Sequence, residues 1–100
     1  MREKRHLMRL TNTEIATIKD VILTQDPNAK VYLYGSRVDD NKKGGDIDLL
    51  VMSDIIDFDK KVDIMSQLFN ALDEQKVDLL ISHNKNDPFV KVARKTAKRL

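Results

Sequence analysis

Two aspartates stand two residues apart at the start of a strongly apolar run. Asp46 and Asp48 flank Ile47, and residues 47–52 are almost wholly apolar, a pattern that predicts a buried strand. Side chains alternate along a strand, so both carboxylates share one face, with α-carbons roughly 6–7 Å apart. At that separation they repel each other unless a cation lies between them, and they can converge on one hard divalent ion or share two. The alternative is a strand that starts at the surface, with Asp46 capping a turn.

A third aspartate, Asp78, interrupts another predicted strand at residues 76–82. An unpaired carboxylate in such an apolar run is unfavourable unless a cation or strong hydrogen bonds compensate for its burial. If this strand lies beside the strand of Asp46 and Asp48, the three aspartates form one cluster. The alternative is an edge strand in which Asp78 faces water.

The third feature is Gly35-Ser36, directly after a short β-rich run at residues 31–34. Glycine lets backbone amides approach a phosphate closely, and the serine hydroxyl can donate to it. A Gly-Ser pair can equally be a plain turn. Three basic residues follow and can neutralise phosphate charge: Arg37, Lys42 and Lys43.

The elements that must position these residues alternate between helices and strands. Thr11 and Glu14 have the spacing of a capping box, which predicts that a helix begins there. Its apolar residues recur at helical spacing as far as Ile22, and Asp26-Pro27-Asn28 ends it. Its apolar stripe consists of Ile15, Ile18, Val21 and Ile22.

Two more helices are predicted later in the chain. Asp57 is the expected N-cap of one, and Asp87-Pro88 begins the other, with proline in the first turn. We expect the first to pack on the core through Phe58, Val62, Met65, Phe69 and Leu72. We expect the second to do so through Phe89, Val90, Ala93, Ala97 and Leu100.

The predicted order is helix, strand, strand, helix, strand, helix, which indicates an α/β (α+β) fold with a small sheet covered by helices. One hundred residues make a single domain, residues 1–100, of which residues 1–10 are expected to form a flexible basic leader. Apolar residues make up 41% of the chain, too many for a disordered protein.

Composition narrows the function classes. No apolar run approaches the ~20 residues that span a bilayer, and residues 1–10 lack the continuous apolar core of a signal peptide. The absence of cysteine excludes disulfides and thiolate metal sites and fits a cytoplasmic protein. A net charge of +2 is too small to indicate nucleic-acid binding by itself. The basic ends of the chain can hold phosphates or an acidic partner, or they can be solvated helix faces.

Together, Gly35-Ser36, Asp46-Ile47-Asp48 and the strand residue Asp78 resemble the signature of the DNA polymerase β-type nucleotidyltransferase superfamily. The small size and the sequence around these residues resemble its minimal nucleotidyltransferase group. The resemblance extends over roughly residues 11–81, and the chain departs from the pattern at residues 38–40 and at Gly45. It implies a polymerase β palm-like fold with a mixed sheet of three strands or slightly more.

The resemblance also implies a role for each residue. Gly35 and Ser36 would hold the β- and γ-phosphates of a nucleoside triphosphate. Asp46 and Asp48 would hold two Mg²⁺ ions, and Asp78 would help to hold the catalytic ion and promote deprotonation of the acceptor hydroxyl. Attack on the α-phosphate would then release pyrophosphate.

Three classes of function follow, of which we favour the first. The chain would transfer AMP from ATP to an acceptor supplied by a partner. Stand-alone proteins of this group resemble antitoxins that are paired with a small helical HEPN-type ribonuclease toxin. Alternatively, it binds metal or nucleotide without catalysis and neutralises such a partner by contact. In the third class, its basic C-terminal helix binds nucleic acid. The resemblance allows a homo- or hetero-oligomer.

Overall fold

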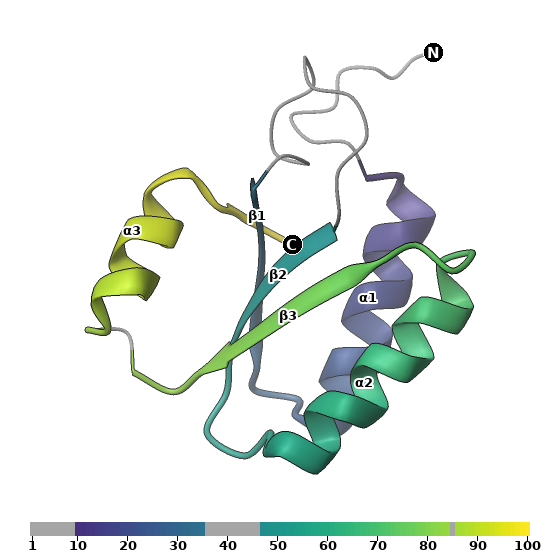
Figure 1. Cartoon of the computed structure of the whole chain (residues 1–100), viewed down its shortest axis with the longest axis horizontal. Helices are drawn as coiled ribbons and strands as arrows, with labels where there is room; N and C mark the ends of the chain where they lie inside the picture. The colour runs from purple at the N-terminus through teal and green to yellow at the C-terminus, as the bar shows by residue number, and fades with distance from the viewer. Residues whose placement is uncertain (1–9, 36–46, 85) are drawn as a thin grey trace.

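The computed structural model describes residues 10–35, 47–84 and 86–100. Within these residues, four strands form a mixed sheet, and three helices cover both of its faces (Figure 1). In chain order the elements are α1 (Asn12–Gln25), β1 (Lys30–Tyr34), β2 (Ile47–Met52), α2 (Phe58–Ala71), β3 (Val77–Ser82), α3 (Pro88–Thr96) and β4 (Lys98–Arg99).

The strands lie in the order β3-β2-β1-β4. β1 is antiparallel to both β2 and β4, whereas β2 and β3 are parallel and α2 connects them. This mixed sheet confirms the predicted α+β class. Since β2 and β3 run in the same direction, residues near their first positions lie at the same end of the sheet.

The capping box at the start of α1 is confirmed. The Thr11 hydroxyl accepts from the Glu14 amide at 3.0 Å, and the Glu14 carboxylate accepts from the Thr11 amide at 2.9 Å. Ile18 and Ile22 are fully buried, as the helical spacing predicted. The helix ends at Gln25, directly before the predicted stop.

The predicted core face of α2 was only partly right, since Leu72 is buried and Met65 packs against the core but the other three residues do not. Its N-cap is Asp57, as expected, but Phe58, Val62 and Phe69 are 73%, 48% and 43% exposed. Ile64 and Leu68 are fully buried instead. The helix carries two apolar stripes about one residue apart, and their spacing alone does not reveal which one faces the sheet.

The last helix is shorter than predicted, and a strand was missed. α3 ends at Thr96, and the next residues turn back to pair with β1. The Leu100 amide donates to the Val31 carbonyl at 2.9 Å, which holds this segment in place. A two-residue strand has too few side chains for an alternating pattern, so no signal in the sequence predicted it.

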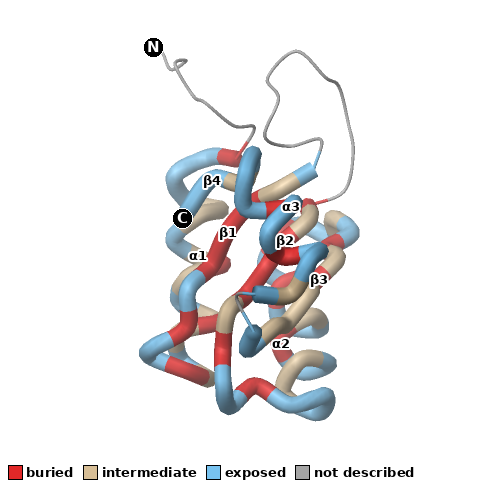
Figure 2. The backbone as a smooth tube through the Cα atoms, turned by 90° about the vertical axis from the view of Figure 1, so that its left-hand side faces the viewer, coloured by how far each residue is buried: buried red, intermediate tan, exposed pale blue. Residues whose placement is uncertain are grey.

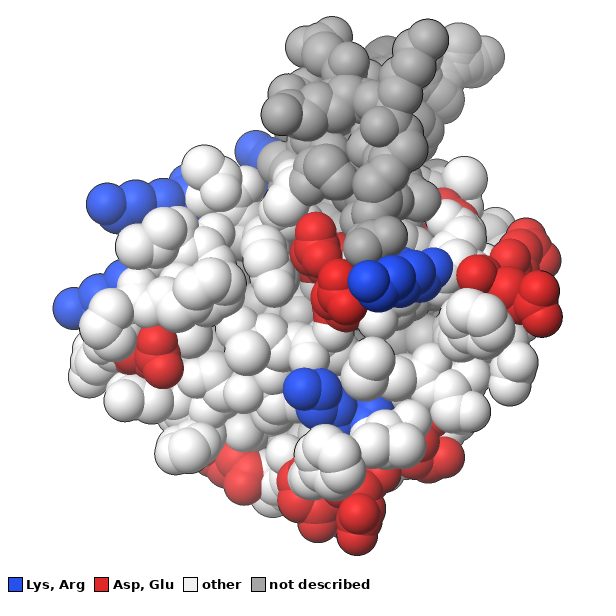
Figure 3. All heavy atoms as spheres, in the orientation of Figure 1, with Lys and Arg blue, Asp and Glu red and all other residues white. Residues whose placement is uncertain are grey.

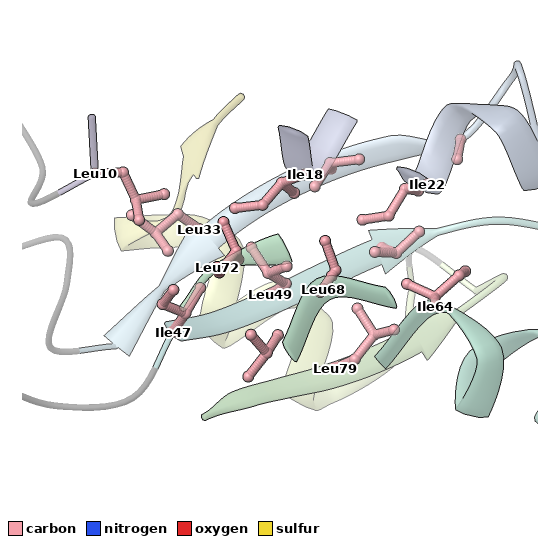
Figure 4. Packing of buried hydrophobic residues seen from close by; sticks show 14 of the residues in the cluster. Leu10, Ile18, Ile22, Leu33, Ile47, Leu49, Ile64, Leu68, Leu72 and Leu79 are labelled. Carbon is pink, nitrogen blue, oxygen red and sulfur yellow. The ribbon is translucent and has the colours of Figure 1, made fainter. Parts of the chain in front are cut away.

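The main core lies between the sheet and the pair α1 and α2 (Figures 2 and 4). Leu33, Leu49 and Leu79 project from three neighbouring strands into it. Leu10, which we had expected in the leader, is also buried there. A smaller cluster occupies the other face of the sheet, where α3 packs, and comprises Tyr32, Leu50, Val90 and Ala93.

Candidate active site

Asp48 and Asp78 are register partners in the parallel pair of β2 and β3. Neighbouring strands are about 4.8 Å apart, so the two residues are direct neighbours across the sheet. Both are partly buried. Alternation places them on the α3 face, because Leu49 and Leu79 point into the main core.

β3 is an edge strand, which is the position that the alternative interpretation of Asp78 assumed. Asp78 nevertheless does not stand alone at this edge, since its register partner on β2 is a second carboxylate. Like charges directly opposite each other destabilise a sheet. Interactions that offset this repulsion stabilise the pairing, and a bound cation is one that suits two carboxylates.

Gly35 follows β1 and borders Asp48. Its φ of +80° lies in the left-handed region, which glycine adopts without strain. A Cβ at this position would collide with the Asp48 carboxylate and lie 3.1 Å from its Cγ. Only glycine leaves the Asp48 carboxylate in its place. The structure therefore gives a second reason for glycine at this position, besides the predicted close approach of a phosphate.

Tyr34 is the register partner of Asp48 on the other side of β2. Burial raises the pKa of the Tyr34 phenol, and the negative charges of Asp48 and then Asp78 raise it further. The phenol therefore stays neutral at physiological pH and lies within the electrostatic field of both carboxylates. Its ring also makes an edge-to-face contact with Phe89 of α3, with centroids 6.1 Å apart.

The donor chemistry of this site fits a hard divalent cation. Two adjacent carboxylates supply oxygen ligands of the kind that Mg²⁺ prefers. Within residues 10–35, 47–84 and 86–100, no group of three or more acidic, histidine or cysteine side chains could hold a metal. Figure 3 shows a small acidic patch near the end of the sheet where β2 and β3 begin, with a basic side chain beside it, and a larger acidic group at the lower edge of this face.

The remaining predicted site residues lie outside the described residues. They are Asp46, Ser36, Arg37, Lys42 and Lys43. The structure thus brings together Gly35, Asp48 and Asp78 and describes no position for the other five.

Comparison with known protein families identifies the family of this chain. Residues 16–100 match the family model described as "Polymerase beta, Nucleotidyltransferase". The chain belongs to the polymerase beta nucleotidyltransferase family. No curated protein matches the chain. At the level of this family, the chain is a transferase that acts on nucleotides.

Two aromatic residues beside the candidate site were not predicted from the sequence. Tyr34 was assigned only to a strand and Phe89 only to a core stripe, yet the two rings contact each other next to the carboxylates. Alternation along β1 gives the face of Tyr34 but not its partner. The register between β1 and β2 decides that, and it was not predictable from the sequence.

A separate open cavity of about 500 Å³ lies at the other end of the sheet. Its walls include Asp26, Lys30, Ser53 and His83, and neither Asp48 nor Asp78 lines it. Asp26 accepts hydrogen bonds from Ser53 and from the Asn28 amide, so both its oxygens serve the fold. This cavity is therefore separate from the candidate site at Asp48 and Asp78. No helix in the described parts of the chain is long and apolar enough to cross a membrane.

Proposed function

We propose that this chain transfers AMP from ATP to an acceptor hydroxyl, with Asp46, Asp48 and Asp78 as ligands of two Mg²⁺ ions. The observation that carries the proposal is the in-register pair of Asp48 and Asp78 in a chain of the nucleotidyltransferase family. Gly35 supports it, because its backbone gives Asp48 the space that any side chain would fill.

Each group has a defined task in the proposed reaction. The acceptor oxygen attacks the α-phosphorus, and the bond from that phosphorus to the oxygen bridging to the β-phosphate breaks. Pyrophosphate leaves with the electron pair, and Asp78 accepts the proton of the acceptor. Gly35 and Ser36 hold the β- and γ-phosphates, with Arg37, Lys42 and Lys43 as counter-charges. Bound Mg²⁺ would offset the negative charge of the phosphates and the carboxylates.

We further propose that the acceptor belongs to a partner protein, a helical HEPN-type ribonuclease. The described residues form one sheet with three helices, and all of these elements are used to build and cover that sheet. An acceptor hydroxyl brought by another protein would be presented at the end of the sheet where β2 and β3 begin, next to Asp48 and Asp78. This step rests on the family resemblance.

The position of the label in radioactive ATP tests the reaction type. The purified chain is incubated with Mg²⁺ and a candidate HEPN-type partner protein, using ATP labelled at either the α- or the γ-phosphate. Label from the α-phosphate alone should reach the acceptor. Asp48→Asn and Asp78→Asn should abolish transfer, whereas Asp20→Asn, at an exposed position on α1, should retain it. Transfer of the γ-label, or α-transfer that survives both variants, would contradict the proposal.

A further inference from the structure

One side of α2 carries an apolar stripe whose residues are mostly exposed. Phe58, Val62 and Phe69 are exposed, whereas Met65 between them is half-buried and packs against the main core. Ile55, just before the helix, is 54% exposed. The helical positions follow a four-three-four spacing, which is the spacing of the seam between two packed helices. From Phe58 to Phe69 the stripe is about 16 Å long, at 1.5 Å per residue.

This stripe lies within an acidic segment. Residues 57–74 contain five acidic residues against two lysines, although the whole chain has a net charge of +2. All five acidic residues are exposed: Asp57, Asp59, Asp63, Asp73 and Glu74. Any surface that covers the stripe therefore brings its own charges close to these carboxylates.

We propose that the α2 stripe is a docking surface for an amphipathic helix of a partner protein, with an apolar seam flanked by lysine or arginine. The spacing selects a helix as the occupant, since a second helix places its own apolar residues between those of the stripe. Asp59 and Asp63, on the side of the stripe away from Lys61, select basic residues on the facing side of that helix. A second copy of this chain docking α2 against α2 would instead oppose two acidic segments, which like-charge repulsion disfavours.

The docking surface is separate from the nucleotidyltransferase site. α2 packs on one face of the sheet, and Asp48 and Asp78 lie on the other. Partner binding and nucleotidyl transfer can therefore be measured independently. Failure of one proposal leaves the other in place.

Binding of two synthetic peptides to the full-length chain tests the proposal. Both peptides have leucines at helical spacing over four turns, with lysine at the remaining positions in one and glutamate in the other. Fluorescence anisotropy should show that the lysine peptide binds the wild-type chain and that the glutamate peptide does not. The double variant Phe58→Ser/Phe69→Ser should weaken binding of the lysine peptide at least about tenfold.

The matched control is Val92→Ser, which removes another exposed apolar side chain, on α3. It should leave peptide binding unchanged, and thermal unfolding should confirm that all variants are folded. Three results would overturn the proposal: no binding of the lysine peptide, equal binding by the Phe58→Ser/Phe69→Ser variant, or equal binding of the glutamate peptide. A dimer of the free chain that dissociates in that variant, detected by light scattering, would also overturn it by identifying a second copy as the occupant.

Discussion

Tyr34, Asp48 and Asp78 occupy adjacent register positions on three neighbouring strands. Asp78 on the edge strand is therefore not an isolated carboxylate, because Asp48 lies directly beside it. Burial of the Tyr34 phenol raises its pKa most, and the negative charges of Asp48 and Asp78 raise it further. Gly35 completes the row by giving space to Asp48.

Gly35→Ala should damage both stability and ligand binding. An alanine at positive φ costs about 1–2 kcal/mol, and its methyl group would also displace the Asp48 carboxylate. We expect urea unfolding to show a loss of at least that size, and calorimetry to show weaker binding of Mg²⁺ and ATP. A folded variant with unchanged stability and binding would show that the contact with Asp48 is unimportant.

Tyr34 should make the protein more sensitive to alkaline pH. Its pKa in the folded chain is raised above 10.0, so between these values the folded state binds more protons than the unfolded state. The free energy of unfolding must therefore fall as the pH rises through this interval. Urea unfolding at about pH 9 and about pH 11 should show a larger loss for the wild-type chain than for Tyr34→Phe. Equal losses in the two proteins would argue against a raised pKa.

At the scale of elements, a buried hydrogen bond links the segment that follows α1 to the segment that precedes α2. Asp26 after α1 accepts from the Ser53 hydroxyl at 2.6 Å, and that hydroxyl accepts from the Ile55 and Ile56 amides before α2. The Asn28 amide donates to the other oxygen of Asp26. The contact therefore fixes how α1 and α2 enter and leave the sheet.

Asp26→Ala should destabilise the chain by about 1–3 kcal/mol for each buried donor left without its acceptor. Urea unfolding measures this loss. Asp20→Ala on the exposed side of α1 is the control and should change stability by less than about 0.5 kcal/mol. If Asp26→Ala were as mild as the control, the bond between Asp26 and Ser53 would not hold the two connections together.

Local signals in the sequence predicted the elements well where side chains bond to their own backbone. Thr11, Glu14 and Asp57 mark helix starts in this way, and all three do so in the structure. What depends on distant neighbours was not predictable. The buried face of α2 follows from the sheet beneath it, and β4 exists only because residues 98–99 meet β1.

The same distinction holds for the candidate site. Alternation along the strand predicted that Asp48 shares a face with Asp46. The apolar run around Asp78 predicted that its carboxylate needs a cation or strong hydrogen bonds. Their direct pairing required the parallel register of β2 and β3, which the sequence could only suggest. Tyr34 was missed for the same reason.

At the scale of the whole molecule, charge is divided between faces. The α2 segment is acidic, whereas the last ten residues carry five basic residues and no acidic one. Two of those five have a structural contact, because Arg94 and Arg99 lie over the Tyr32 ring at 5.4 and 6.0 Å from its centroid. This packing supports a structural role for part of the basic end, in preference to a surface devoted to nucleic acid.

The central claim is that Asp48 and Asp78 together hold the metal that binds the nucleotide. Calorimetric titration of ATP in the presence and absence of Mg²⁺ tests it most directly, on the wild-type chain and on Asp48→Asn/Asp78→Asn. The account predicts binding by the wild-type chain that requires Mg²⁺ and is weakened at least about tenfold in the double variant. Equal affinity in the two proteins, binding without Mg²⁺, or no binding at millimolar ATP would contradict it.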